Sequence, residues 1–111
     1  MAESVDIVSI SITAEDDEHL ADITRTLVRE RLAACGNIIG GVRSVYAWQG
    51  EIEDEEEALL ILHTSAALVD RVVERVRELH PYDTPQVLAV PVVGALEGYR
   101  RWILDWATGE A

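Results

Sequence analysis

The chain has 111 residues and a mass of 12.3 kDa, and its 49% apolar and 27% charged residues are the balance of a single globular domain over residues 1–111. Its 21 acidic residues outnumber nine arginines, with no lysine, so the net charge of −12 argues against nucleic acid and anionic membranes as partners. One cysteine cannot form an internal disulfide, no apolar run exceeds five residues when Gly and Pro are excluded, and no basic signal-peptide segment is visible, so we expect a cytoplasmic protein.

The first third of the chain predicts a strand followed by a helix. Alternating apolar and polar residues over Val5–Thr13 indicate a strand with one buried face. Thr13 and the residues that follow it, through Asp16, are typical of a helix start with a hydroxyl cap and early acids. The apolar stripe of this helix has spacings of three, four and seven residues: Leu20, Ile23, Leu27 and Ala34. We expect the helix to end near Ala33–Gly36.

A long hairpin follows this helix. Gly36–Trp48 and Glu51–Thr64 are its two extended arms, joined by a two-residue turn at Gln49-Gly50 because glycine tolerates positive φ. The glycine pair Gly40-Gly41 inside the first arm indicates a bulge or a bend. The second arm ends in Ala58–Leu62, which is apolar at every position and therefore typical of a strand covered on both faces.

The remainder of the chain predicts a helix, a strand and a short terminal helix. The helix begins near residues 64–65 and ends at His80, because the next residue is proline and disfavours helical conformation before it. Gln86–Val93 is a fourth strand, and Pro91, which has no N–H, indicates that this strand is an edge strand or leaves the hydrogen-bond ladder at that point. Tyr99–Trp106 carries the aromatic stripe of the last helix.

The element order βαββαβ plus a terminal helix predicts an α+β, ferredoxin-like fold: a four-stranded antiparallel sheet with two helices on one face. The two helices leave the second face of an apolar strand uncovered, and another copy of the chain is the simplest cover. Thirteen extended residues span about 43 Å, whereas a compact chain of this length is about 34 Å across. The hairpin should therefore project and pair with the edge of a neighbour, unless the glycine bend folds it back.

Candidate chemistry rests on isolated residues, because the sequence holds no phosphate loop, Cys-x-x-Cys, His-Glu-x-x-His or Gly-x-Ser-x-Gly motif. Cys35, at a helix-to-strand junction, is typical of a small packing residue, with redox chemistry or a Cu(I) or Zn site as the alternative. His80 either caps the last helix carbonyls or lines a pocket with Tyr82. We interpret His19 and His63 as structural or solvated.

Six of the seven residues from 51 to 57 are acidic. Strand alternation spreads their carboxylates along a line, whereas a hard cation needs several oxygens at one point, so we interpret the run as a solvated face or a partner for arginines, with weak cation binding as the alternative. Tyr46, Trp48 and Tyr82 are amphipathic aromatic residues of the kind enriched at interfaces, and a pocket at that interface is the more specific hypothesis.

Several segments of the sequence, in order, resemble the CutA family of divalent-cation tolerance proteins: Glu30–Ile39, Val45–Glu53, Leu79–Pro85 and Tyr99–Ile103. The similarity extends from about Val5 to Trp106. It implies a ferredoxin-like subunit, a homotrimer built like the PII signalling proteins, a cytoplasmic location and a role in the response to metal ions, with copper bound by some members. It implies no established enzymatic reaction.

The resemblance also implies a set of cleft residues between subunits: Cys35, Tyr46, Trp48, Glu53, His80 and Tyr82. Two positions depart from members that bind copper, because Ile12 stands where they have a cysteine and Leu79 where they have a second histidine. His80 alone remains as a metal candidate. A bound Cu²⁺ or other divalent cation would therefore need ligands from symmetry mates or from acidic residues.

We therefore expect a homotrimer, not an enzyme, that acts in the response to divalent metal ions and binds copper or another divalent cation weakly at its subunit interface. One alternative is a PII-like sensor or adaptor that binds a small ligand in the cleft around Trp48, His80 and Tyr82. A second alternative is an enzyme that uses Cys35 or His80, which is disfavoured because no base with an orienting partner is visible in the sequence.

Overall fold

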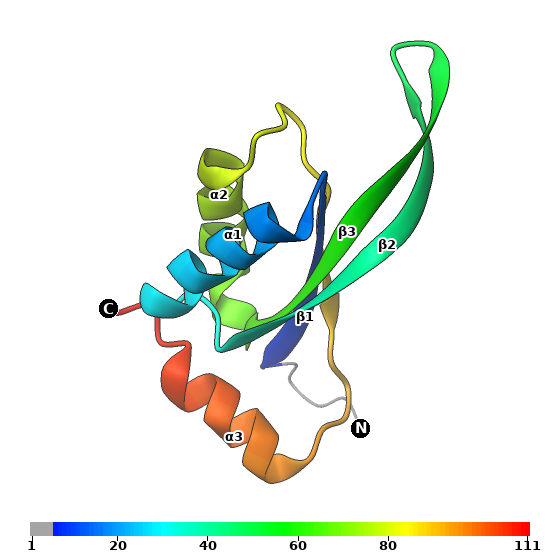
Figure 1. The fold of residues 1–111 in the computed structure, drawn as a ribbon. Coiled ribbons are helices and arrows are strands. Elements are labelled where there is room, and N and C mark those ends of the chain that lie inside the picture. Colours follow the sequence, from blue (N-terminus) through cyan, green and yellow to red (C-terminus); the bar gives the residue numbers. More distant parts are fainter. Residues whose placement is uncertain (1–5) are drawn as a thin grey trace.

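The computed structural model describes residues 6–111, so Val5, the expected first residue of the first strand, lies outside the described residues. Figure 1 shows two helices packed side by side on one face of a twisted sheet, and a third helix at one end of it. The helices and strands have these bounds: β1 Ile7–Ala14, α1 Asp17–Arg29, β2 Cys35–Trp48, β3 Glu51–Ser65, the 3₁₀ turn η1 Ala66–Leu68, α2 Val69–Leu79, β4 Val87–Pro91 and α3 Glu97–Trp106. The predicted ferredoxin-like order is confirmed.

The sheet is antiparallel throughout, with the strand order β2-β3-β1-β4. This order places β4 at an edge, as its proline predicted, and the two central strands β1 and β3 in the middle. Strand alternation sends Ile10, Ile12 and Leu60 to the helix side, where each is completely buried. They pack there against Leu20 of α1 and the neighbouring α2 to form the main core.

The ends of the helices differ in part from the prediction. Asp16, rather than Thr13, caps α1, since its Oδ1 accepts a 2.9 Å hydrogen bond from the backbone N–H of His19. The helix also ends at Arg29, earlier than expected, because Arg31 adopts a left-handed conformation with φ 61° and turns the chain. Ala34 therefore lies outside the helix. The longest helix has 13 residues, and none within residues 6–111 is long and apolar enough to cross a membrane.

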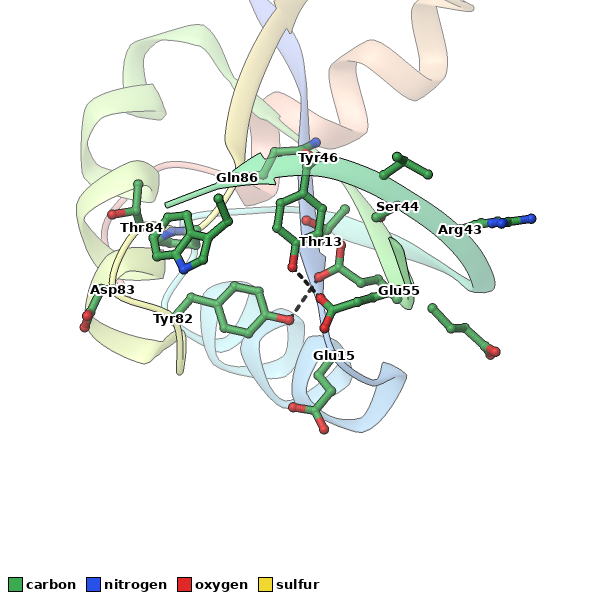
Figure 2. A pocket seen from close by; sticks show the side chains of 15 residues that line it. Thr13, Glu15, Arg43, Ser44, Tyr46, Glu55, Tyr82, Asp83, Thr84 and Gln86 are labelled. Carbon is green, nitrogen blue, oxygen red and sulfur yellow. Dashed lines mark hydrogen bonds between the residues drawn. The ribbon is translucent and has the colours of Figure 1, made fainter. Parts of the chain in front are cut away.

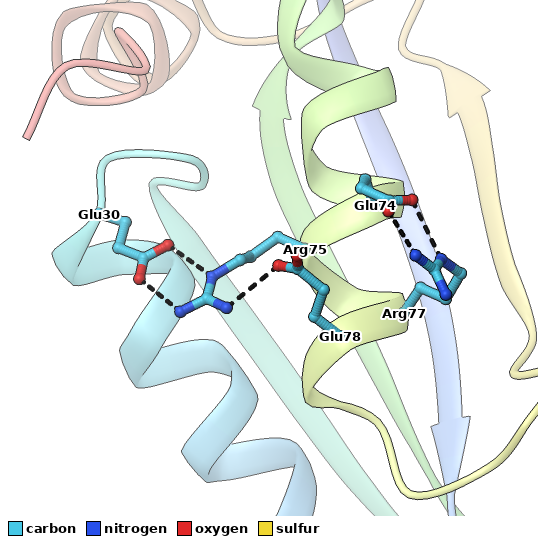
Figure 3. A network of polar contacts seen from close by, with 5 residues as sticks. All are labelled: Glu30, Glu74, Arg75, Arg77 and Glu78. Carbon is cyan, nitrogen blue, oxygen red and sulfur yellow. Dashed lines mark hydrogen bonds and ion pairs between the residues drawn. The ribbon is translucent and has the colours of Figure 1, made fainter.

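An arginine on α2 ties the two covering helices together. Figure 3 shows the Arg75 guanidinium between two carboxylates: it donates to Glu30, after the end of α1, at 2.8 and 2.9 Å, and to Glu78 on its own helix at 3.2 Å. The bonds from Arg75 lower the pKa of the Glu30 carboxyl. A second pair, Arg77 with Glu74, lies on α2 at the i,i+3 spacing that brings side chains together on a helix. The arginines thus hold acids of the helix layer in place.

The β2–β3 hairpin projects from the body as predicted (Figure 1), and the chain measures 43 × 34 × 22 Å along its principal axes. Its turn has positive φ at both Gln49 (49°) and Gly50 (82°), the geometry of a tight two-residue hairpin turn. A β-bulge at the glycine pair shifts the register by one residue: Val42 faces Glu57, but Ile39 faces Leu59. Gly41 provides the left-handed φ of 70° that this bulge requires.

The second face of the sheet carries apolar side chains that the helices α1 and α2 do not cover. Because Ile10 points to the helices, its neighbours in β1 point away, and so do their partners Leu88 and Val90 in β4. These two side chains are 59% and 54% exposed, and Ile39 of β2 is 47% exposed. Helix α3 covers only one end of this face, where Ile103 packs on Ile7. An exposed apolar face remains over β2 and β4.

The helix α2 offers a matched test of this core. Val72 is completely buried and Val73, its neighbour, is 37% exposed. We expect Val72→Ala to lower the free energy of unfolding by about 2 kcal/mol, because it removes buried methyl groups and leaves a cavity. Val73→Ala carries the same helix-propensity change and should cost less than about half as much. Urea unfolding at one fixed protein concentration measures both; equal losses would contradict the packing described here.

Candidate functional site

A cleft of about 1090 Å³ lies where the hairpin leaves the body of the protein. Its walls come from three places: the end of β1, the hairpin arms around Tyr46 and Glu55, and the loop from Tyr82 to Gln86 that leads from α2 to β4. Figure 2 shows the rings of Tyr46 and Tyr82 on facing walls, with Glu55 beside their hydroxyl groups and Glu15 directed away from them. The cleft therefore combines aromatic walls with an acidic floor.

A buried carboxylate stands at the centre of this arrangement. Glu57, in β3, is only 7% exposed, and its Oε2 accepts a 2.9 Å hydrogen bond from the Tyr82 hydroxyl. A carboxylate taken out of water needs such donors, because an unpartnered buried charge is costly. Burial, followed by the bond to Glu57, raises the pKa of Tyr82 well above its usual range. Tyr82 is thus a permanent hydrogen-bond donor to Glu57.

A second tyrosine and carboxylate pair lies beside the first. The Tyr46 hydroxyl donates to Glu55 Oε1, two residues further along β3 than its register partner Glu53. This hydrogen bond, with desolvation and the surrounding glutamates, raises the pKa of Tyr46 to about 12. Glu55 and Glu57 belong to the acidic run that the sequence favoured as a solvated face. The hairpin register is the signal that could have found them, because it places Tyr46 diagonally across from Glu55.

His80, the predicted metal candidate, is 7% exposed and makes hydrogen bonds through both ring nitrogens. Nε2 lies 2.7 Å from the carbonyl oxygen of Thr13, so it carries the proton and donates it. Nδ1 accepts a 3.1 Å hydrogen bond from the backbone N–H of Tyr82. The ring also packs against that of Tyr82, with centroids 4.7 Å apart. His80 therefore positions Tyr82, and neither nitrogen has a lone pair free for a metal ion in this arrangement.

The other predicted cleft residues divide into two groups. Tyr46, Trp48 and Tyr82 all line the cleft. Glu53 lies opposite Tyr46 in the hairpin but does not line the cavity. Cys35 lies at the start of β2, away from the cleft, beside His63 and Tyr99.

Negative charge dominates the cleft. Five of its lining residues are acidic: Glu15, Glu55, Glu56, Glu57 and Asp83. Its one lining arginine, Arg43, donates bonds of 2.7 and 2.9 Å to Asp54 and points away from the cavity in Figure 2. Within residues 6–111, however, no three His, Cys, Asp or Glu side chains come close enough to hold a metal ion. One chain alone thus offers an acidic surface with hydrogen-bonding aromatic walls and no complete set of metal ligands.

Comparison with known proteins gives consistent matches over nearly the whole chain. The model of the family described as CutA1 divalent ion tolerance protein matches residues 8–105. The Divalent-cation tolerance protein CutA of Thermus thermophilus is 42% identical over 97 residues, which are 87% of this chain and 90% of that protein. Protein CutA, chloroplastic, of Arabidopsis thaliana is 34% identical over 102 residues, which are 92% of this chain and 56% of the plant protein.

A solved structure gives the same result for the fold. The crystal structure of CutA from Xylella fastidiosa superposes with a TM-score of 0.85 at 41% identity, and it covers 88% of this chain and 94% of that one.

The tyrosines give a spectroscopic test of the cleft. All three tyrosines of the chain have a pKa raised above the usual 10: Tyr46 and Tyr99 to about 12, and Tyr82 further. Between about pH 10 and 11 the native protein should therefore show little phenolate absorbance, whereas the urea-unfolded chain should ionise near its ordinary value of about 10. Because the pKa values of the tyrosines are higher in the folded than in the unfolded state, their protonated hydroxyl groups stabilise the fold. This stabilisation is fully present below about pH 10 and is lost as the pH rises through about 12.

A variant of the partner carboxylate identifies the titration of Tyr46. Glu55→Gln removes the charged partner of Tyr46 and should bring one phenol back towards pH 10. Glu56→Gln is the matched control: Glu56 also lines the cleft, but the acids that raise the pKa of Tyr46 are Glu55, Glu57 and Glu53. A native wild-type phenol that titrates near 10 would contradict the tyrosine and glutamate pairing.

Proposed function

The chain belongs to the CutA1 family of divalent ion tolerance proteins, and from this membership we propose that it acts as a homotrimer in the cellular response to divalent metal ions. The family name describes a tolerance phenotype and names no reaction. We propose that the role of the protein is binding, with the acidic cleft at the base of the hairpin as the site whose occupancy matters.

The observation that carries the assembly is the apolar sheet face that α1 and α2 leave uncovered. Leu88 and Val90 on one edge strand and Ile39 on the other are each about half exposed. An exposed face of this kind is typical of a protein interface, and unpaired strand edges are ready to pair with another chain. A copy of the same chain satisfies both features, because its projecting hairpin reaches beyond its own body. Closed assembly around three copies is the form that the family resemblance implies.

The site residues fit one kind of cation better than another. Copper at His80 does not fit: both nitrogens of the ring are hydrogen-bonded, and Ile12 and Leu79 offer no ligand atoms. A hard divalent cation fits the oxygen chemistry of the cleft, where Glu55 and Glu57 each keep one carboxylate oxygen that the tyrosines do not use. We propose weak binding there, completed by groups of a neighbouring subunit.

A binding role is also favoured over an enzymatic one. Cys35 pairs with His63 near one end of β3, whereas His80 bonds to Thr13, which faces Leu59 towards the other end. Cys35 and His80 therefore do not share a site, and the histidine that Cys35 does contact, His63, makes its side-chain hydrogen bonds through Nδ1, with no orienting partner on Nε2 within residues 6–111. We propose a cytoplasmic location as well, because the one cysteine is free and nothing in the fold depends on an oxidising compartment.

The aromatic walls support a second candidate, a PII-like sensor that binds a small ligand in the cleft. The cavity volume is large enough for a small molecule, and Tyr46, Trp48 and Tyr82 offer flat apolar surfaces with polar ends. The acidic floor favours a cationic or hydrogen-bonding ligand over an anion. A thermal-shift screen separates the candidates, since a metabolite that raises Tm when divalent cations do not would favour the sensor.

The assembly has a direct test. Light scattering after size-exclusion chromatography should give three times the 12.3 kDa mass of the chain. Leu88→Glu should break the assembly, because it buries an unpaired charge in the apolar interface. Val73→Glu places the same charge on the outer side of α2 and should leave the mass unchanged. A wild-type monomer at micromolar concentration would contradict the proposal.

Cation binding at the cleft has a separate test. Titration calorimetry with Mn²⁺ should show binding with a Kd of about 10⁻³ M. Glu55→Gln should weaken it by about tenfold, because it removes an oxygen ligand and a charge. Asp22→Asn removes an acid from the outer side of α1, where it pairs with Arg25, and is the matched control. Equal affinities in the two variants would show that Mn²⁺ meets only the general negative surface.

A further inference from the structure

Three side chains from different elements meet at the opposite end of the sheet from the cleft. Cys35 Sγ, at the start of β2, lies 3.5 Å from Nδ1 of His63 in β3 and 3.1 Å from the hydroxyl of Tyr99 in α3. The third side of this triangle, from His63 Nδ1 to the Tyr99 hydroxyl, is also 3.1 Å. A sulfur, an imidazole nitrogen and a phenol oxygen therefore converge on one point. None of the three residues lines the cleft.

The fold holds these groups firmly. The bulge at the glycine pair sets Cys35 opposite His63, so that both side chains leave the sheet on the same face. Tyr99 arrives from α3, which is anchored by Ile103 against Ile7 and Ala34. The Tyr99 ring meets that of His63 edge-on at 5.9 Å and stacks on Trp102 at 5.6 Å. The triangle is thus built on two paired strands and a packed helix, not on loops.

We propose that Cys35, His63 and Tyr99 form a binding site for a thiophilic metal ion, with Cu(I) as the best fit, held by the Cys35 sulfur and His63 Nδ1. The spacing of the donors supports this. With bonds of about 2.3 Å to sulfur and about 2.1 Å to nitrogen, a sulfur–metal–nitrogen angle near 110° places the two donors about 3.6 Å apart, and such a bent angle requires a third ligand, which the Tyr99 hydroxyl supplies. The separation between Cys35 Sγ and His63 Nδ1 is 3.5 Å, so the ion needs no movement of the strands.

The protonation states suit this chemistry. Burial lowers the pKa of His63, which keeps its imidazole neutral and able to donate a lone pair near neutral pH. The hydrogen bond with Cys35 raises the pKa of Tyr99 to about 12, so its hydroxyl remains protonated and serves as a donor to the thiolate or as a weak third ligand. On binding, the thiol proton leaves to solvent and the sulfur bonds the metal. The oxidation state of the ion does not change.

The number of ligands favours Cu(I) over Zn²⁺. Thiolate and imidazole suit both ions, but structural zinc takes four protein ligands, and this site supplies two strong donors and a phenol. Cys35 is partly exposed and Tyr99 is 39% exposed, so an ion can reach the sulfur from solvent. The inference is independent of the proposed role of the acidic cleft, because the two sites share no residue.

Competition between the protein and a chromophoric Cu(I) chelator, under reducing and anaerobic conditions, tests the site. The assembled wild-type protein should take one Cu(I) per chain. Cys35→Ser should weaken binding by more than about 100-fold, and His63→Gln by about 10- to 100-fold, whereas Tyr99→Phe should cost about tenfold or less. His19→Gln, an exposed histidine of α1, is the matched control and should bind like the wild type.

The His63→Gln variant separates the proposed site from a lone thiol. If it binds Cu(I) as tightly as the wild type, or if the wild type binds no better than Cys35→Ser, the site does not exist and the triangle is only a hydrogen-bonded packing contact. A cobalt(II) titration resolves the choice of ion: a thiolate charge-transfer band lost in both variants would support the same two ligands with Zn²⁺ as the ion. Should the variants fail to fold, protection of wild-type Cys35 from alkylation by Cu(I) gives the answer without them, and absence of protection overturns the proposal.

Discussion

The register between β2 and β3 decides which side chains meet at both ends of the molecule. Near the tip the tight turn fixes Trp48 opposite Glu51, and this pairing brings Tyr46 within reach of Glu55. Below the bulge the register moves by one residue, so that Cys35 faces His63. An unbroken register would set Cys35 opposite Thr64, whose side chain points into the core, and the sulfur would then lie on the other face of the sheet. One extra residue at a glycine pair therefore creates one site without disturbing the other.

The excess acidic side chains have different hydrogen-bond partners in different parts of the fold. On the helix layer, arginines neutralise it through paired contacts such as Arg75 with Glu30. In the cleft no arginine is free, and tyrosine hydroxyls take over as donors to Glu55 and Glu57. A neutral donor satisfies a carboxylate without cancelling its charge. The helix layer is consequently close to balanced where it packs, whereas the cleft keeps a negative potential that a cation can use.

Most of the fold followed from local patterns, and the site followed only in part. Alternation, the Gln49-Gly50 turn and the proline rules placed the strands, the hairpin and the edge position of β4. The end of α1 was missed because Arg31, not glycine, takes the left-handed conformation, and its guanidinium stacks 3.9 Å above the Trp106 ring from the far end of the chain. His80 was predicted in the right place, but its bond to the carbonyl of Thr13 depends on tertiary contact that no local pattern encodes.

The pairing of His63 with Cys35 shows what a sequence reading would have needed. Two features of the sequence, the two-residue turn and a one-residue bulge at the glycine pair, together give the register of β2 against β3. The contact of Tyr99 with the pair depends instead on how α3 packs, which the sequence does not specify locally. Both sites lie on the sheet face that α1 and α2 leave open, so the proposed assembly and the proposed ligand binding would act on the same surface. An ion that prefers the assembled form must stabilise it by the same free energy with which assembly strengthens ion binding. The proposed subunit interface at this face would therefore make the stability of the assembly and its metal occupancy two measures of one equilibrium.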